Sequence, residues 1–351
     1  FLESSAISTD IGERTPTRLF DRSLSFLDER KRSLSPLSQE RSQTDTIGEQ
    51  TDLYPSYIRA RFEVNDVIRK SDYYTDYDGV AKLTERKVAL RCYDNAFSVE
   101  NRDKILREIK LMKFFKHENV QSIKKVMIPK NIHEVNKVFC SLQPMNSDLE
   151  QYLWQNQLEE DHIKYFMYQI LRGLKYIHST GVIHRDLRLK NILLNENCEV
   201  KISGFHLARG IEKENESNLY SISAFRSQLR APEVLVEPSN YSMASDIWAV
   251  GCIFAELLAR QNGLTLQDLP SLYLFLAPPT EYERELLQNH PTVVFAQTVP
   301  EDSRVILGSI FQKSSFCALS LLDRMLTWTP ETRISLQECL EHPFFEEIHG
   351  E

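Results

Sequence analysis

The chain has 351 residues, of which 42% are hydrophobic and 26% charged, and its formal net charge is -8. This length allows two domains or one large bilobal domain, and the composition is typical of globular proteins. The acidic balance argues against nucleic acid as the main partner, and no apolar run is long enough to span a membrane. The six cysteines lie far apart without metal-ligand spacing, which favours free thiols in a reducing compartment, so we expect a cytoplasmic or nuclear protein.

Residues 1–55 carry many Ser, Thr, Arg, Asp and Glu residues without a sustained hydrophobic period. Such a segment buries too little apolar surface to offset the entropy of ordering, so we predict a disordered tail. Thr15 and Ser35 each precede a proline and are candidate sites of proline-directed phosphorylation. The basic run 30–32 and the leucines after it are either a docking peptide or, more simply, a solvated charged linker.

Folded structure is expected from Phe62 onward. Residues 62–68 alternate as in a strand, and the apolar run 88–92 predicts a second strand. Residues 104–112 have helical spacing. From 161 to 178 apolar residues recur every three to four positions, which predicts a long helix with one face in the core.

The stretch 184–209 carries the main chemical signal. It reads H-R-D-L-R-L-K-N, an apolar strand and polar turn, and then K-I-S-G-F-H-L-A-R. It resembles the catalytic loop of protein kinases, H-R-D-L-x-x-x-N followed by D-F-G, whose first Asp accepts the substrate proton while the Asn and the second Asp hold magnesium. The resemblance gives these roles to Asp186 and Asn191, but Gly204 stands where the metal-binding Asp belongs. His206 could recruit a soft metal, although a lone histidine more often packs or faces solvent.

This resemblance implies an α+β, bilobal protein kinase fold with a small β-rich N-lobe over 56–144 and a large helical C-lobe over 145–351. The words Y-Q-I-L-R-G-L-K-Y-I-H at 168–178 and V-I-H-R-D-L after them are similar to those of the mitogen-activated protein kinases. Residues of about 260–317 then correspond to the insert of that family. The basic run in the tail resembles the docking peptides that bind these kinases.

The nucleotide site is altered in the N-lobe as well. Residues 88–92 resemble the kinase V-A-I-K strand with Arg91 in place of the phosphate-pairing lysine, and Glu108 takes the position of its carboxylate partner. A guanidinium can bridge a carboxylate, so we expect the ion pair to persist, but it fits phosphates differently from an ammonium. Counting back from Arg91 places Arg69, Ser71 and Tyr74 at the three glycine positions of the phosphate loop and Asp76 where an apolar residue covers the adenine. The rest of the vestigial nucleotide pocket is assigned to Ala89, Leu142 as gatekeeper, Met145 and Leu193.

The activation segment extends from Gly204 to Glu233. Its dual-phosphorylation motif T-x-Y falls on residues 221–223, which gives Ser221, Ser223 and the adjacent Tyr220 as candidate regulatory residues. Arg188 replaces the lysine two residues beyond the catalytic Asp. By contrast, the resemblance implies that the structural ion pair of Glu233 with Arg333 and the D-x-W-x-x-G helix start at Asp246 are intact.

These residues favour a catalytically impaired pseudokinase that serves as scaffold, decoy or allosteric regulator and needs no cofactor. One alternative is an atypical Ser/Thr kinase with residual activity that uses ATP and Mg²⁺, since Asp186 and Asn191 remain. Another is a phosphorylated adaptor that acts through its tail. The partners that the resemblance implies are mitogen-activated protein kinase kinases, mitogen-activated protein kinases or their substrates.

Overall fold

The computed structural model describes residues 54–71, 73–94, 96, 98, 101–127, 137–211, 230–265, 279–286 and 303–348. The candidate regulatory residues all lie outside these ranges: Thr15, Ser35, Tyr220, Ser221 and Ser223. Tyr54, which the sequence analysis assigned to the tail, packs its ring edge-on against Tyr77 at 5.3 Å. The described fold therefore starts no later than Tyr54, just before the short helix α3 (Ser56–Arg59).

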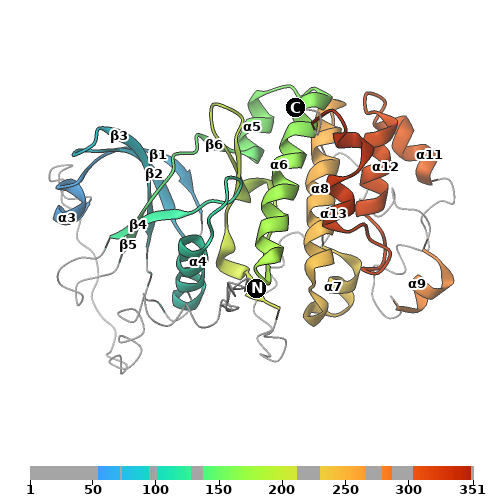
Figure 1. Cartoon of the computed structure of the whole chain (residues 1–351), viewed down its shortest axis with the longest axis horizontal. Helices are drawn as coiled ribbons and strands as arrows, with labels where there is room; N and C mark the ends of the chain where they lie inside the picture. The colour runs from blue at the N-terminus through green and yellow to red at the C-terminus, as the bar shows by residue number, and fades with distance from the viewer. Residues whose placement is uncertain are drawn as a thin grey trace, which may run out of the picture. The chain divides into compact units, whose positions relative to one another are not determined.

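The N-terminal part of the fold is one antiparallel sheet in the order β1-β2-β3-β5-β4 (Figure 1). Its strands are β1 (Phe62–Lys70), β2 (Thr75–Ala81), β3 (Arg86–Tyr93), β4 (Ile123–Met127) and β5 (Val138–Leu142). The predicted strands at 62–68 and 88–92 are both present and are longer than expected. One face buries a cluster that includes Ile58, Phe62, Leu90 and Phe139.

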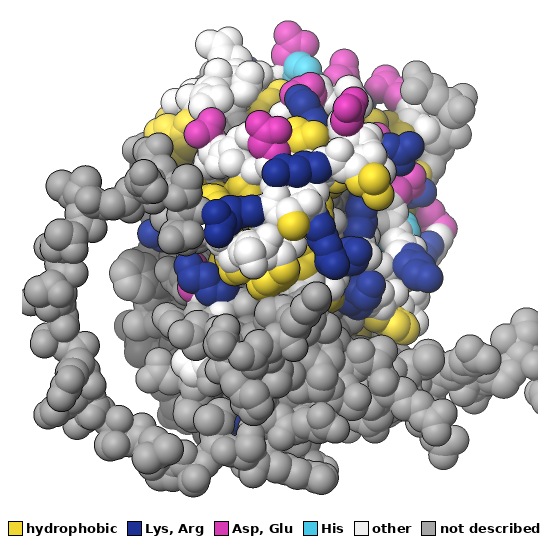
Figure 2. All heavy atoms as spheres, turned by 90° about the vertical axis from the view of Figure 1, so that its left-hand side faces the viewer, with side chains coloured by type: hydrophobic (Ala, Val, Ile, Leu, Met, Phe, Trp, Pro, Cys, Tyr) yellow, Lys and Arg dark blue, Asp and Glu magenta, His cyan; other side chains and the backbone are white. Residues whose placement is uncertain are grey.

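Figure 2 shows the face at the outer end of this sheet, where lysine and arginine side chains gather. Exposed basic residues at the β2–β3 turn and beside it are Arg61, Lys82, Arg86 and Lys87. The outer end of the sheet is therefore charged and open to solvent. Asp76 and Arg91 face each other near the other end of strands β2 and β3, away from this turn.

Helix α4 (Arg102–Phe114) runs beside the sheet (Figure 1) and covers the predicted helical range. It buries the apolar residues Ile105, Ile109, Leu111 and Met112 at helical spacing, together with one carboxylate, Glu108. A carboxylate on the buried face of an amphipathic helix requires a charged partner, because an unpaired buried charge is costly. This requirement determines the arrangement of the site described below.

The C-terminal part is helical. Two long helices, α6 (Glu160–Ser179) and α8 (Met243–Gln261), pack side by side at its centre (Figure 1). Helix α8 is apolar nearly all round and is buried nearly all round, as such a composition requires. The remaining helices are α5 (Leu149–Gln155), α7 (Pro232–Val236), α9 (Glu281–Leu286), α11 (Ser303–Ile310), α12 (Phe316–Met325) and α13 (Leu336–Leu340). Among the described residues, no helix is both long and apolar enough to cross a bilayer.

Short strands between the two parts position the chemical residues. Strands β8 (Ile192–Leu194) and β9 (Val200–Ile202) form a hairpin that β6 (Ser147–Asp148) joins at one edge. Strand β7 (Val182–Ile183) pairs with β10 (Arg209–Gly210). Because the 184–191 loop leads into β8 and residues 203–207 follow β9, the hairpin brings the two halves of the kinase-like motif together.

Candidate functional site

The loop after β7 is fixed by a buried carboxylate of helix α8. Asp246 accepts hydrogen bonds from the backbone N–H groups of His184 at 2.8 Å and Arg185 at 3.0 Å, and lies 2.8 Å from His178 Nε2. Charge-assisted bonds of this kind are among the stronger ones in proteins. The loop keeps Arg185 at a φ of +69°, a conformation that non-glycine residues adopt only under constraint.

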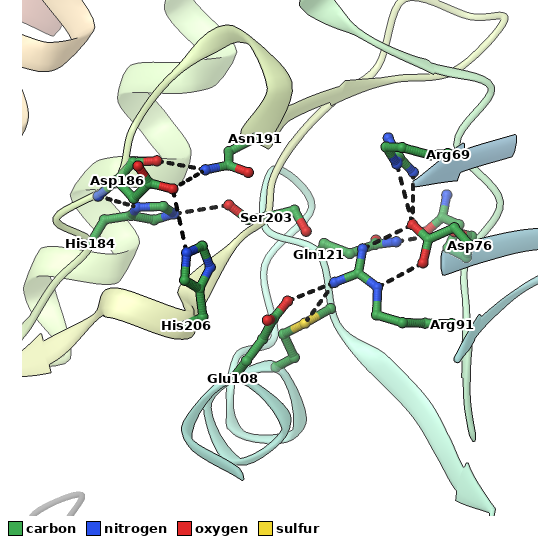
Figure 3. A network of polar contacts seen from close by, with 12 residues as sticks. Arg69, Asp76, Arg91, Glu108, Gln121, His184, Asp186, Asn191, Ser203 and His206 are labelled. Atoms are coloured by element: carbon green, nitrogen blue, oxygen red, sulfur yellow. Dashed lines mark hydrogen bonds and ion pairs between the residues drawn. The ribbon is translucent and has the colours of Figure 1, made fainter. Parts of the chain in front are cut away.

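Asp186, the candidate proton acceptor, lies within this loop with its side chain about one-fifth exposed (Figure 3). Asn191 donates to its carboxylate Oδ2 at 2.8 Å and to its backbone oxygen at 2.7 Å. Arg188 Nε lies 3.4 Å from the same carboxylate. Burial raises the pKa of Asp186 above its ordinary value, although Arg188 opposes the shift. The structure therefore brings all three predicted catalytic residues together.

Gly204 adopts a left-handed conformation, with φ +84°, directly beside Asn191. A Cβ atom at this position would lie 2.5 Å from Asn191 Cγ, which is far inside van der Waals contact. The Asn191 amide therefore occupies the space in which any side chain at residue 204 would begin. The amide nitrogen of this side chain donates to Asp186.

A magnesium ion would find few ligands here. Mg²⁺ requires several oxygen donors in octahedral geometry, usually including carboxylates, and Asp186 is the one carboxylate of the described loop residues. Within the described ranges no group of three or more His, Cys, Asp or Glu side chains is arranged to hold a metal. The donor set present does not fit the magnesium of a kinase site.

His206, which follows Phe205, is packed and not exposed. Its ring lies 4.7 Å from the ring of Tyr73, and its backbone oxygen accepts a hydrogen bond from Arg107 at 2.7 Å. Burial, with the nearby cationic groups, lowers its pKa to about 3, so the imidazole is neutral at physiological pH. Phe205 lies between His184 and Phe115, with ring separations of 4.9 and 5.0 Å.

The second half of the site is a cluster of buried charges centred on Arg91 (Figure 3). Its guanidinium donates to Glu108 Oε1 at 2.6 Å and, on its other edge, to both carboxylate oxygens of Asp76 at 2.7 and 2.9 Å. Arg69 reaches Asp76 Oδ2 at 3.1 Å. The ring of Tyr74 covers the guanidinium of Arg91 at 3.5 Å.

The expected pair of Arg91 and Glu108 is confirmed, and Asp76 is the partner that sequence reasoning missed. Asp76 and Arg91 are facing residues in the β2–β3 register, and they are 1% and 0% exposed. The available signal was a charged residue at a position where the resemblance called for an apolar one. Because a buried carboxylate needs a cation, a charge at that position pointed to Arg91.

The charges of the cluster balance one another, since two arginines face two carboxylates. Burial alone would raise the pKa of Asp76, but Arg91 and Arg69 outweigh it and hold that pKa below its ordinary value. Burial, together with the charge of Asp76, raises the pKa of Glu108 to about 7, although Arg91 opposes the shift. Above that pH, where Glu108 is ionised, the cluster is neutral without an added anion.

A nucleotide fits this half of the site poorly. The hairpin between β1 and β2 carries no glycine and is closed by a hydrogen bond from Ser71 N to Tyr74 O at 2.8 Å. Two of the three glycine positions hold the bulky side chains of Arg69 and Tyr74, and the carboxylate of Asp76 already binds one edge of the Arg91 guanidinium. The apolar residues assigned to the vestigial pocket are all buried: Ala89, Leu142, Met145 and Leu193.

The structural ion pair of the large lobe is also present. Arg333 contacts both oxygens of Glu233 at 2.8 and 3.0 Å and donates to the backbone oxygens of Ala244 and Thr327. The pair joins helix α7, at the end of the activation segment, to the start of α8.

A sheet-rich lobe, a helical lobe and the loop of Asp186 between them define a protein kinase domain, and the protein kinase domain family model matches residues 71–345. The chain is 39% identical over 272 residues to mitogen-activated protein kinase 5 of Oryza sativa subsp. indica, covering 76% of this chain and 73% of that protein. It is 38% identical over 272 residues both to mitogen-activated protein kinase 3 and to mitogen-activated protein kinase 6 of Arabidopsis thaliana, covering 76% of this chain and 73% and 68% of those proteins. The chain belongs to the mitogen-activated protein kinase family.

Proposed function

We propose that this chain is a catalytically impaired member of its family that acts as a scaffold, decoy or allosteric regulator in a phosphorylation cascade. The observation that carries the proposal is the contact between Gly204 and Asn191. Residue 204 contributes no carboxylate, and the Asn191 amide fills the space where one would begin. The remaining metal-ligand position, Asn191, donates to Asp186, and the Asp186 carboxylate also lies near Arg188.

The chemistry of phosphoryl transfer makes this loss severe. Transfer depends mainly on positioning and on neutralising phosphate charge, so there is little covalent work in which other residues could compensate. Removing one preorganised electrostatic group commonly costs about a hundredfold to a thousandfold in rate. Here the metal-binding carboxylate is absent and the Arg91 edge that would meet a phosphate is occupied by Asp76.

The internal contacts that hold the large lobe together are kept. The loop is still held by Asp246, and Glu233 still pairs with Arg333. Relatives are named mitogen-activated protein kinases, so the partners that we propose are kinases that act on that family, other members of it, or their substrates. We propose action in the cytoplasm or nucleus without a nucleic-acid or membrane partner, and without ATP or Mg²⁺ as cofactor.

A second candidate is an atypical Ser/Thr kinase with residual ATP-dependent activity. The favouring observation is that Asp186, Arg188 and Asn191 still form one hydrogen-bonded and ion-paired group. In this case ATP and Mg²⁺ would bind in a geometry different from that of other kinases.

Two measurements separate these candidates. Purified protein is incubated with labelled ATP, Mg²⁺ or Mn²⁺ and a generic Ser/Thr-Pro substrate, and the expected result is no transfer above background. Transfer that disappears in Asp186→Ala would contradict the proposal, and this variant controls for a contaminating kinase. In a thermal-shift experiment, millimolar ATP with either metal should leave the Tm unchanged, since a ligand that binds only the folded state raises it.

The scaffold role has its own test. A purified mitogen-activated protein kinase kinase is titrated calorimetrically against the full chain, with and without ATP and Mg²⁺. We expect the same affinity in both cases, because the proposed binding does not use the nucleotide site. Loss of binding in the absence of nucleotide would oppose the scaffold role.

A further inference from the structure

The hairpin that joins β1 to β2 contacts helix α4 and the large lobe at the same time. Through Asp76 it reaches Arg91 on β3, and Arg91 reaches Glu108 on α4. Through Tyr73 it reaches His206, which follows strand β9 in the large lobe. Helix α4 therefore meets the hairpin through charges and the large lobe through the bond from Arg107 to His206 O.

The charged half of this connection is a series of ion pairs. Arg69, Asp76, Arg91 and Glu108 come from β1, β2, β3 and α4 in that order, and each contacts the next (Figure 3). All four are at most 7% exposed. Removing ions from water costs several kcal/mol for each one. This group of four charged residues is therefore stable only while its charges keep their partners.

The aromatic half closes the opposite side of the hairpin. The Tyr73 ring packs against the neutral imidazole of His206, and Lys104 of α4 lies 3.4 Å from the Tyr73 hydroxyl. Tyr73 thus touches α4 and the large lobe, while its neighbour Tyr74 covers the guanidinium of Arg91. The consecutive turn residues Tyr73 and Tyr74 therefore contact helix α4, the large lobe and Arg91 of strand β3.

We propose that the β1–β2 hairpin is a ligand-independent latch: Asp76 holds helix α4 through Arg91, and Tyr73 holds the large lobe through His206. The domain then keeps one closed arrangement with no bound nucleotide. Asp76 and Glu108 already orient the Arg91 guanidinium, so no external anion is needed to orient it. This inference deepens the proposed function and rests on it, since a scaffold without nucleotide needs another means of holding its shape.

Hydrogen exchange of the α4 amides in the full chain tests the latch. In Asp76→Asn we expect exchange in α4 to accelerate at least about tenfold, because Arg91 and Arg69 lose their shared anion, while α6 and α8 stay protected. The matched control is Asp78→Asn, two residues along the same strand, whose carboxylate makes an exposed hydrogen bond to Asn65. It should leave α4 unchanged.

The second variant tests the aromatic contact. Tyr73→Ser removes the ring that packs on His206, so exchange should accelerate in residues 205–207 with a smaller effect on α4. If Asp76→Asn does not fold, Arg69→Gln replaces it. Among the four charged residues Arg69 contacts only Asp76, so its loss leaves the ion pairs of Arg91 with Asp76 and Glu108 intact. It should give a smaller acceleration, again confined to α4 and the hairpin.

Unchanged exchange in α4 of Asp76→Asn, or of Arg69→Gln where that replaces it, would overturn the latch. So would protection of α4 in the wild-type chain that develops only after ATP and Mg²⁺ are added. Phosphoryl transfer by the wild-type chain, with the exchange pattern as expected, would instead overturn the proposed function and leave the latch standing.

Discussion

The contact between Gly204 and Asn191 can be measured with a double-mutant cycle. The perturbation is Gly204→Ala, which adds only a Cβ atom. At φ +84° a residue other than glycine costs about 1 to 2 kcal/mol from backbone strain. The new Cβ would also lie 2.5 Å from Asn191 Cγ and force that side chain away.

Moving Asn191 breaks its hydrogen bonds to Asp186 Oδ2 and to the Asp186 backbone oxygen. At a net value of about 1 kcal/mol for each bond, this adds about 2 kcal/mol. We therefore expect Gly204→Ala to lower the free energy of unfolding by about 3 to 4 kcal/mol in the wild-type background. In Asn191→Ala, where the side chain is already absent, only the backbone strain remains and the cost falls to about 1 to 2 kcal/mol.

Urea denaturation of the wild-type chain, both single variants and the double variant gives the coupling directly. The expected coupling is about 2 kcal/mol, with the double variant more stable than the sum of the single effects. Effects that add within about 0.5 kcal/mol would refute the reasoning, because they would place the Asn191 amide away from residue 204.

Other predictions concern the buried ion pairs. Arg91→Lys introduces the lysine of the kinase motif, but it should lower the free energy of unfolding by about 2 to 4 kcal/mol in urea denaturation. One ammonium cannot bind Asp76 bidentately and also reach Glu108. Unchanged stability would contradict this. Glu108 has a pKa of about 7 in the folded chain against an ordinary 4.5, so the folded state binds more protons between these values and its stability falls as pH rises through them. Glu108→Gln lacks this dependence, and between pH 5 and 8 its stability relative to wild type should rise by about 2 to 3 kcal/mol; parallel pH profiles would show that Glu108 does not titrate there. Arg333→Met should lower stability by about 3 to 5 kcal/mol by leaving Glu233 unpaired, and a change below about 1 kcal/mol would mean that the pair is solvated.

The fold was predictable because its signals are local sequence motifs and regular spacings of apolar residues. The spacing of apolar residues from 161 to 178 gave helix α6, and the catalytic-loop words placed Asp186 and Asn191 in one loop. The pair of Arg91 and Glu108 was predictable for the same reason, since each residue belongs to a recognisable motif, one of a strand and one of a helix.

The role of Asp76 was not predictable in the same way. Counting back from Arg91 gave its position, but its ion pair depends on the register in which β2 and β3 face each other. The contact of Tyr73 with His206 is further removed from sequence, because it joins a hairpin turn to a segment of the other lobe. Side-chain pairs of this kind follow from how elements dock, and no period or motif encodes them.

The altered residues of the site depend on one another. Asp76 supplies the anion that the buried Arg91 needs. Arg69 is a second cation that contacts the same Asp76 carboxylate. Gly204 likewise leaves the space that the Asn191 amide fills. If catalytic groups had simply been lost, buried charges without partners would remain, each costing several kcal/mol. In this chain Asp76, Arg91 and Arg69 satisfy one another within the protein, as do Gly204 and Asn191.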